Sequence, residues 1–334
     1  MTGSLRPLTP SQRAHVVAKL VRMERATNDG VPAPRLLARR FFSARRALYP
    51  FADFPPASFL DDWEIETRLL RINPPDAVDR LTDKLALHRL GIDGTLPVSL
   101  PRLLAVVRDG AVVEGRWRGE AAIAKPRRGS GGAGVVRLLP GDPLPDGSEL
   151  LLEAPVASVP AIGRVFPGAL STVRVVTARD AGGVFVLGAA HRFATAASLP
   201  TDNFKRGGIV AAVHPATGAL SEAVLAPAGR ARRTARDHPD TGVPIAGLAV
   251  PRWHAVRDAA LRAMDAFPTL RYAGWDFAVT GRGPVLIEAN AALPNPNLIQ
   301  AHRPLLSDRR ARDFFTATGV IGARRARAAG RAVG

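Results

Sequence analysis

Three polar side chains near the C-terminal end have types and spacing that suit a hard cation. Two apolar runs flank a glycine-rich turn at Arg282, and Asp276 and Glu288 each lie six residues from that arginine. A symmetric hairpin would place the two carboxylates opposite one another, with Asn290 on the same face as Glu288. Opposed carboxylates repel unless a cation lies between them, and Mg2+ prefers such oxygen ligands. The pattern predicts a metal site, although a hairpin whose polar face merely meets water has the same spacing. The other face is predicted to be apolar, formed by Trp275, Phe277, Val279, Val285, Ile287 and Ala289.

A rare lysine precedes a glycine-dense stretch in the middle of the chain. Only four of the 46 basic residues are lysines, and Lys125 stands just before Gly129–Gly134. Glycines let backbone N–H groups approach a ligand closely, and a neighbouring ammonium suits a polyphosphate. A β-like run, Val135–Leu139, follows the glycines, which excludes the helix that a dinucleotide site or a Walker A loop requires. The loop therefore joins two strands, either as a flap over phosphates or as a plain hairpin turn.

The elements that must position these residues change in character along the chain. Residues 1–80 have helical and irregular patterns, with a helix at Ser11–Ala26, and a further helix is predicted at Thr82–Leu90 with Lys84 in its first turn. Short β runs separated by turn residues then predict an antiparallel lobe. Its strands are predicted at Leu103–Val107, Ala111–Val113, Ala121–Lys125, Gly134–Leu139 and Glu149–Glu153. A second β-rich block covers Ser171–Val213, and a helix is predicted at Trp253–Phe267.

Composition narrows the function classes further. The chain has 334 residues and a net charge of +17. Because it has no cysteine, disulfides, thiolate catalysis and cysteine-ligated metals are excluded. No apolar run is long enough to span a bilayer and Met1–Pro10 lacks a signal-peptide pattern, which predicts a cytoplasmic protein without a membrane partner. Arginine is spread over the whole chain and no nucleic-acid module is recognised, so a nucleic-acid partner is not expected. The densest arginines lie at the C-terminal end: Arg309, Arg310, Arg312, Arg324, Arg325, Arg327 and Arg331.

Taken together, these segments resemble the ATP-grasp superfamily, most closely its sugar-transfer-associated, glutamate-ligase-like branch. The resemblance spans about residues 81–300 and rests on pieces that occur in the family's order. These are Asp83-Lys84-Leu85, Lys125-Pro126 with the glycine loop, Leu151-Leu152-Glu153, Ser171-Thr172-Val173-Arg174, Asp202-Asn203-Phe204 with Gly207-Gly208, Gly274-Trp275-Asp276, and Glu288-Ala289-Asn290. The implied fold is α+β, an ATP-grasp fold in which two antiparallel-sheet lobes with packed helices clasp ATP behind a mainly helical N-terminal region.

The resemblance also implies a role for individual residues. The implied nucleotide contacts are Lys84 and Lys125 at the phosphates, the covering loop Gly129, Ser130, Gly131 and Gly132, and Glu153, Ala154 and Val156 at adenine. The implied ligands of Mg2+, or of Mn2+ in its place, are Asp276, Glu288 and Asn290. Arg174, Arg192 and Asn203 would face the transferred phosphoryl group or an acyl phosphate, with Lys205 as a further phosphate contact. Such groups neutralise charge on phosphate oxygens, which phosphoryl transfer requires. Taken alone, Arg174 also fits a surface strand, Lys205 a loop charge and Glu153 a strand end.

The implied activity is that of an ATP- and Mg2+-dependent carboxylate–amine ligase that acts through an acyl phosphate, with a small carboxylate and an amine as substrates. Two alternatives stay open: an ATP-grasp kinase that phosphorylates a sugar or polyol hydroxyl, and a nucleotide-gated binding protein for an acidic polymer. The expected organisation is a helical region at 1–80, an ATP-grasp N-lobe at 81–156, a C-lobe with the metal site at 157–305 and an Arg-rich tail at 306–334. Residues 1–80 do not resemble the α/β domain that precedes many such ligases. That departure leaves the second-substrate site unassigned, and the sequence leaves the oligomeric state open.

Overall fold

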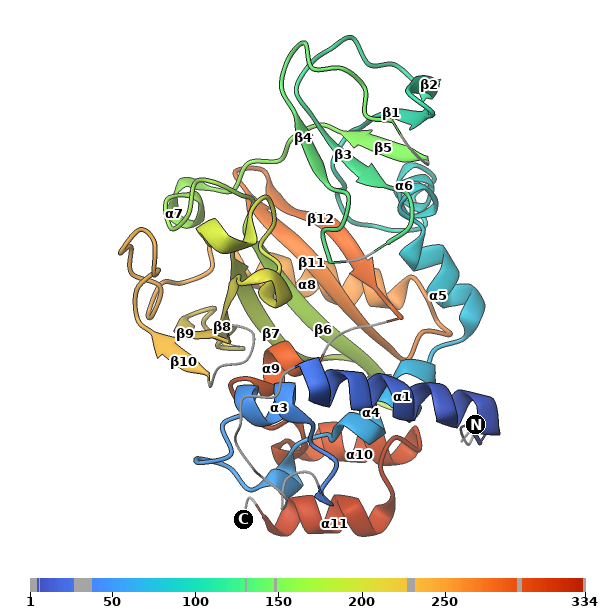
Figure 1. Cartoon of the computed structure of the whole chain (residues 1–334), viewed down its shortest axis with the longest axis vertical. Helices are drawn as coiled ribbons and strands as arrows, with labels where there is room; N and C mark the ends of the chain where they lie inside the picture. The colour runs from blue at the N-terminus through green and yellow to red at the C-terminus, as the bar shows by residue number, and fades with distance from the viewer. Residues whose placement is uncertain are drawn as a thin grey trace.

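The structure is a computed structural model that describes residues 5, 7–26, 38–129, 131–146, 149–226, 232–292 and 296–332. Figure 1 shows a small sheet at the top, a large sheet in the middle and helices from both chain ends at the bottom. Both sheets are antiparallel. The predicted α+β architecture of two antiparallel lobes behind a helical N-terminal region is confirmed. Among the described residues, no helix has the length and apolar character needed to cross a membrane.

The small sheet contains the strands predicted between residues 103 and 153. Its order is β2-β1-β5-β3-β4. The strands are β1 (Leu103–Arg108), β2 (Ala111–Gly115), β3 (Ala122–Pro126), β4 (Val136–Leu138) and β5 (Leu150–Glu153). The glycine loop joins β3 to β4, so the prediction that it connects two strands is confirmed.

Two short helices link this sheet to the rest of the molecule. They are α5 (Pro75–Thr82) and α6 (Lys84–Ile92). Lys84 lies in the first turn of α6, as predicted, although the helix begins at Lys84 rather than at Thr82. Its N-cap is Asp83, whose side chain accepts hydrogen bonds from the N–H groups of Leu85 and Ala86. A carboxylate at this position favours the positive end of the helix dipole, which offsets the unfavourable position of Lys84.

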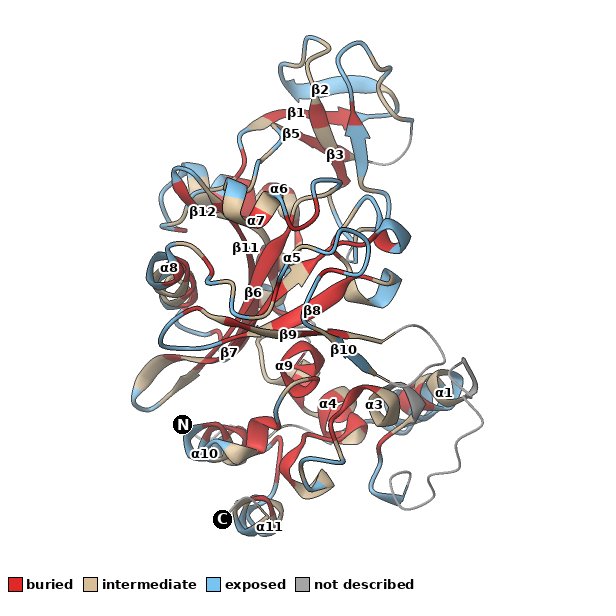
Figure 2. Cartoon of the chain, turned by 90° about the vertical axis from the view of Figure 1, so that its left-hand side faces the viewer, coloured by how far each residue is buried: buried red, intermediate tan, exposed pale blue. Residues whose placement is uncertain are grey.

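The large sheet has the strand order β10-β9-β8-β7-β6-β11-β12. Its strands are β6 (Thr172–Asp180), β7 (Gly183–Phe193), β8 (Ile209–Val213), β9 (Leu220–Leu225), β10 (Arg233–Ala235), β11 (Tyr272–Thr280) and β12 (Gly283–Asn290). Helix α8 (Trp253–Asp265) packs on one face, against a core that includes Val173, Trp275 and Phe277. Figure 2 shows buried residues running through β6, β7 and β11.

Helices from both chain ends cover part of the opposite face. The N-terminal elements are α1 (Pro10–Ala26), α3 (Ser43–Leu48), η1 (Pro56–Ser58), α4 (Asp62–Thr67) and η2 (Leu69–Arg71). The C-terminal ones are α9 (Asn297–Gln300), η5 (Leu305–Ser307), α10 (Arg309–Ala317) and α11 (Ala323–Arg331), and a short helix, α7 (Pro160–Gly163), lies between β5 and β6. Tyr272 and Val176 pack against these terminal helices, whereas Arg174 and Asp276, which side-chain alternation places on the same face of the sheet, lie further along it.

The Arg-rich segment is helical and packs onto the N-terminal helices. Phe314 and Phe315 are buried, and Arg325 pairs with Glu64 and donates hydrogen bonds to the carbonyl groups of Ala57 and Phe59. The proposed boundaries at 80/81 and 305/306 fall inside α5 and η5. As domain limits, they remain predictions.

The hairpin of β11 and β12 has the predicted pairing but reaches it differently. Asp276 lies opposite Glu288, and Gly274 lies opposite Asn290. The turn is tighter than the expected three residues, because Thr280 pairs with Gly283, and a register shift after Asp276 restores the predicted alignment. The shift corrects one expectation for the apolar face: Leu286, rather than Val285 or Ile287, packs in the core beside Trp275, Phe277, Val279 and Ala289.

Candidate nucleotide and phosphoryl-transfer site

A buried ion-pair cluster lies on the sheet face opposite α8. Arg174 lies directly across from Asp276, and its Nε and Nη2 donate to the two carboxylate oxygens, with 2.6 Å between Nη2 and Oδ2. Arg192 Nη2 approaches the same Oδ2 at 3.1 Å. Burial alone would raise the pKa of Asp276, but the two guanidinium groups hold it below its ordinary value. The cluster presents two fixed positive groups from neighbouring strands.

Arg192 has a second acidic partner, which the sequence reasoning did not single out. Its Nη2 lies 3.3 Å from Asp202 Oδ1, and it donates to Thr172 Oγ1 at 2.6 Å. Thr172 in turn donates to Asp202 Oδ2 from its backbone N–H at 2.9 Å and from its hydroxyl at 2.6 Å. Burial raises the pKa of Asp202, and Arg192 and Thr172 oppose that rise. Asp202 belongs to the Asp202-Asn203-Phe204 stretch of the resemblance, and an acidic residue at that position was the only sign in the sequence of a partner for Arg192.

Glu288 and Asn290 complete the set proposed for the metal. Burial and the neighbouring Asp276 raise the pKa of Glu288, and Lys84, Arg174 and Arg192 only partly oppose that rise. Asn290 Nδ2 lies 3.4 Å from Asp276 Oδ2, and its amide oxygen has no hydrogen-bond donor within the described residues. A hard cation fits the oxygens of Glu288 and Asn290. Asp276 is their immediate neighbour, but both of its oxygens already face guanidinium groups. No group of three or more His, Cys, Asp or Glu side chains within the described ranges could hold a metal ion, so the site depends on this mixed set.

Lys125 lies in the wall of the small sheet, buried with an acidic partner. Its Nζ is 2.5 Å from Glu153 Oε2, and His88 Nε2 is 2.9 Å from Glu153 Oε1. Burial alone would raise the pKa of Glu153, but Lys125 and His88 bring it below its ordinary value. Both carboxylate oxygens are therefore occupied. His88 therefore helps to orient this pair.

Lys84 connects the two lobes electrostatically. Its Nζ donates to the carbonyl oxygen of Gly129 at 3.0 Å, at the start of the glycine loop. Burial lowers the pKa of Lys84 and Lys125 lowers it further, whereas Glu288 opposes the decrease. Lys84 of the small-sheet side therefore lies within electrostatic reach of both Lys125 and, on the large sheet, Glu288. This convergence is the arrangement that a polyphosphate with a bound cation requires.

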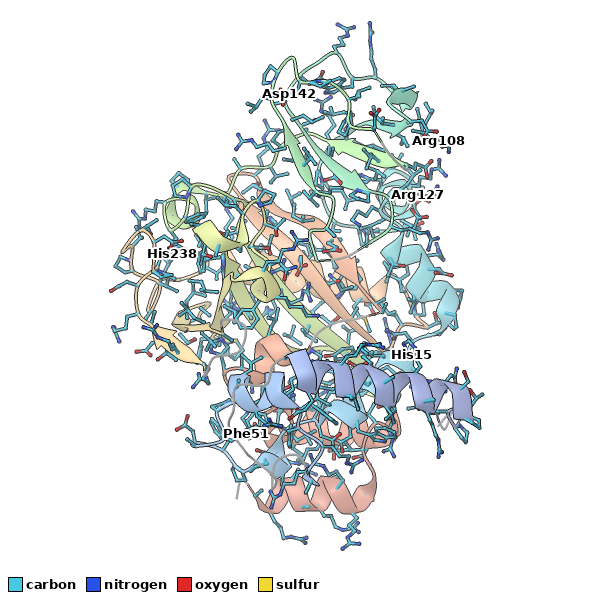
Figure 3. All side chains as sticks on the ribbon, viewed as in Figure 1. His15, Phe51, Arg108, Arg127, Asp142 and His238 are labelled. Atoms are coloured by element: carbon cyan, nitrogen blue, oxygen red, sulfur yellow. The ribbon has the colours of Figure 1, made fainter. Side chains whose placement is uncertain are left out.

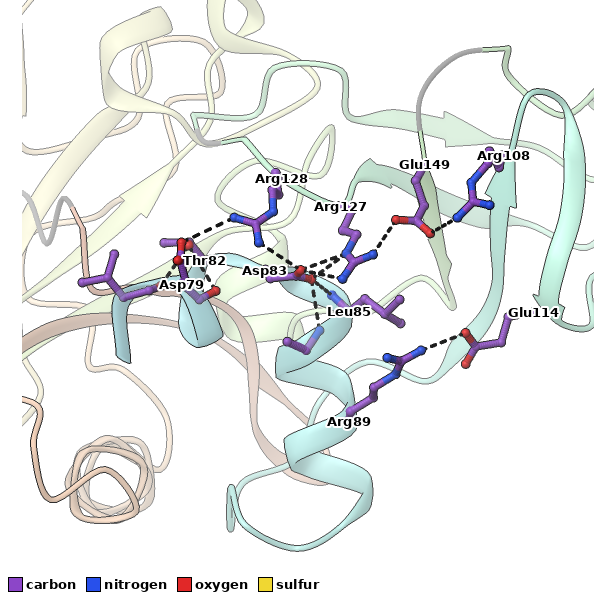
Figure 4. Close-up of polar contacts among 12 residues, drawn as sticks. Asp79, Thr82, Asp83, Leu85, Arg89, Arg108, Glu114, Arg127, Arg128 and Glu149 are labelled. Atoms are coloured by element: carbon purple, nitrogen blue, oxygen red, sulfur yellow. Dashed lines mark hydrogen bonds and ion pairs between the residues drawn. The ribbon is translucent and has the colours of Figure 1, made fainter. Parts of the chain in front are cut away.

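The base of the glycine loop is clamped by Arg127. Its Nε donates to both oxygens of Asp83 at 2.9 Å, and its Nη1 donates to Glu149 at 2.7 Å (Figure 4). Figure 3 places Arg127 beside α6, near the small sheet. The backbone N–H of Lys84 also donates to the carbonyl of Arg127 at 3.1 Å. These contacts fix the loop at its root. No signal in the sequence pointed to them, because Arg127 and Glu149 resemble ordinary surface charges.

The tip of the loop reaches across to the large-sheet lobe. Asn203 Nδ2 donates to the carbonyl of Gly131, so the predicted loop and the predicted catalytic amide are in contact. Gly132 has φ +73°, and a Cβ there would lie 2.7 Å from Thr201 Cγ2, so only glycine fits. Ser130, which belongs to the same predicted set, lies outside the described residues.

The remaining predicted residues are more dispersed. Lys205 lies in η4 (Phe204–Arg206). Burial lowers its pKa, and the positive charges of Arg45 and Lys19 lower it further, which places Lys205 near the N-terminal helices. The backbone N–H of Ala154 donates to Arg102 at 2.9 Å and is not available to a base. Val156 N–H makes no backbone hydrogen bond to the described part of the chain.

A family model matches the part of the chain that carries the large-sheet side of this site. Residues 145–308 match the family model described as sugar-transfer associated ATP-grasp. The predicted ATP-grasp resemblance is confirmed. The matched residues include β6, β7, β11 and β12, so the matched segment carries the ion-pair cluster and the proposed metal residues.

Solved structures of ATP-grasp proteins are similar at low sequence identity. A putative ATP-grasp superfamily protein from Archaeoglobus fulgidus is 18% identical over 66% of this chain and 48% of its own, with a TM-score of 0.35. A RimK domain ATP-grasp protein from Sphaerobacter thermophilus is 16% identical over 74% of this chain and 70% of its own, with a TM-score of 0.38. This chain spans less than half the length of several such structures, for example 43% of an L-amino acid ligase from Bacillus licheniformis, which is 10% identical over 66% of this chain with a TM-score of 0.36. No curated protein matches the chain.

Proposed function

We propose that this protein is an ATP- and Mg2+-dependent carboxylate–amine ligase that forms an amide bond through an acyl phosphate. The observation that carries the proposal is the convergence of Lys84, Lys125 and the glycine loop with Glu288 and the two cluster arginines across the two sheets. Cations from one lobe and a carboxylate–amide pair from the other fit the phosphates of a nucleotide. Lys125 can donate to a phosphate while it holds Glu153, because an ammonium group has three donors.

The nucleotide would lie between the lobes. Its base would meet the backbone after β5 at Val156, and its phosphates would lie under the glycine loop. Glu288 and Asn290, with Asp276 beside them, would hold Mg2+ or Mn2+, and the bound ion supplies positive charge to the phosphate oxygens. Glu153 would act by fixing Lys125, since its oxygens are already occupied.

The reaction proposed at this site has two balanced steps. An oxygen of the substrate carboxylate attacks the γ-phosphorus of ATP, and the bond to the β-phosphate oxygen breaks to leave ADP and an acyl phosphate. An amine then attacks the acyl carbon, phosphate leaves, and the amine nitrogen loses a proton. Arg174 and Arg192 face the side on which the acyl phosphate would form, where fixed guanidinium groups stabilise its charge.

One feature favours a carboxylate acceptor over a hydroxyl. A hydroxyl acceptor needs a positioned base to take its proton, whereas a carboxylate is already ionised at neutral pH. Asp276 and Asp202 both accept hydrogen bonds or ion pairs from arginine, so neither is poised as that base. The kinase alternative therefore has less support than ligation.

The decisive experiment follows the oxygen atoms. Purified protein is incubated with ATP, Mg2+ and a panel of 18O-labelled carboxylates, with hydroxylamine as a general amine. Ligation transfers one 18O atom into the released phosphate and yields a hydroxamate. A parallel panel of sugars and polyols tests the alternative. If it yields a phosphorylated alcohol and no hydroxamate forms, the protein is a kinase. Glu288→Gln serves as the inactive control. Asp180→Asn, at the far end of β6 where Asp180 pairs with Arg310 of α10, serves as the active one.

A further inference from the structure

Three successive residues between η3 (Ala196–Ser198) and η4 connect the glycine loop to the arginine cluster. Thr201 lies under Gly132, and Asn203 donates to the carbonyl of Gly131. Asp202, between them, is buried and points the other way, toward Thr172 and Arg192. The chain neighbours of Asp202 thus touch the loop proposed to cover the phosphates. The same short segment therefore contacts the glycine loop on one side and Arg192 on the other.

The contacts of Arg192 show what holds it there. Arg174 already takes both oxygens of Asp276, so Asp276 alone offers Arg192 only a shared oxygen at 3.1 Å. Asp202 supplies a second carboxylate at 3.3 Å from the same Nη2. Thr172 Oγ1 accepts from Nε at 3.1 Å and from Nη2 at 2.6 Å while it donates to Asp202. Arg192 is therefore fixed on two sides.

We propose that Asp202 is the positioning residue of Arg192: it holds the guanidinium group where the transferred phosphoryl group forms its new bond. The inference deepens the proposed function and rests on it. Asp202 itself touches no substrate, because its oxygens face Thr172 and Arg192. Its removal should therefore affect turnover rather than nucleotide affinity.

The first test separates these two effects. Asp202→Asn keeps the size of the side chain and an acceptor for Thr172 but removes the charge that faces Arg192. We expect kcat for ATP turnover to fall by about tenfold or more, with KM for ATP within about twofold of the parent. Equal kcat in Asp202→Asn and the parent would overturn the inference. Asp180→Asn is the matched control, since it removes an aspartate charge that pairs with an arginine on the exposed surface.

Chemical rescue adds a readout that a purely structural role would not change. In Arg192→Ala the two facing carboxylates remain, so guanidinium chloride at millimolar concentration should rebind between them and restore part of the turnover. Asp202→Asn in that background should raise the half-effective guanidinium concentration by about fivefold or more. The same concentration in both variants would contradict the proposal.

A spectroscopic arm keeps the test independent of turnover. The side-chain 15N signal of Arg192, assigned with Arg192→Lys, should show hindered rotation in the parent and faster rotation in Asp202→Asn. If the parent binds the ATP analogue AMPPNP but turns over no ATP, the proposed function fails. In that case the nitrogen signal alone decides the positioning role, and an unchanged signal would overturn it.

Discussion

Lys125 and Glu153 form a buried pair whose two roles can be separated by mutation. Lys125→Met keeps the length of the side chain but leaves the Glu153 carboxylate, 3% exposed, with His88 as its remaining partner. Removing one partner of a buried pair costs about 3–5 kcal/mol, and the retained histidine favours the lower end, about 3 kcal/mol. With about 2.1 cal/mol/K of unfolding entropy per residue over 334 residues, this loss lowers the melting temperature by about 4 °C.

The loss should depend on pH in a defined direction. Without Lys125, burial raises the pKa of Glu153, so the folded-state pKa exceeds the unfolded one. Stability is then retained at low pH and lost as pH rises through the folded pKa. The defect of Lys125→Met, measured by thermal and urea unfolding, should be larger at about pH 8 than at about pH 5.

The double variant Lys125→Met/Glu153→Gln distinguishes packing from ligand binding. It removes the buried charge, so most of the stability and its pH dependence should return. The affinity for ATP should not return, because an ammonium–phosphate contact worth about 1.5–3 kcal/mol is still missing, and the Kd should stay about 10- to 100-fold higher than in the parent. A Lys125→Met variant with parental melting at both pH values would refute the structural reasoning. Parental ATP affinity in the double variant would refute the phosphate contact.

Other regions give three more predictions. Glu288→Gln and Asn290→Ala should each abolish ATP turnover while unfolding temperatures stay near the parental value, and turnover preserved in both variants would reject the metal assignment. Burial lowers the pKa of His191 from 6.5 to about 3, so its contribution to stability is present above about pH 6.5 and is lost as pH falls toward pH 3; His191→Leu should flatten urea-unfolding stability over that range. Replacing the exposed Arg324 and Arg327 by glutamate should weaken retention on a polyphosphate column if the acidic-polymer alternative holds, and unchanged retention would remove it.

Local patterns in the sequence were sufficient for the strands and for the central pairing. The five runs between residues 103 and 153 became strands because period-two apolar residues between turn residues fit a pleated surface in any antiparallel arrangement. The pairing of Asp276 with Glu288 was predicted from their equal distance in sequence from the turn, and the structure has that pair. The bulge and tighter turn that produce the pairing could not be read from the spacing, because a one-residue shift near the turn leaves the composition of both strands unchanged.

Residue types suited to phosphate chemistry are visible in the sequence, whereas the pairing of these residues depends on the packed chain. Lys125, Arg174 and Glu288 were identifiable because their types and order resemble a known set. Partners distant in the chain, such as Asp202 for Arg192 or His88 for Glu153, depend on how strands and helices meet. A buried charge needs a compensating partner within a few ångströms, and only the packed chain determines which residue supplies it.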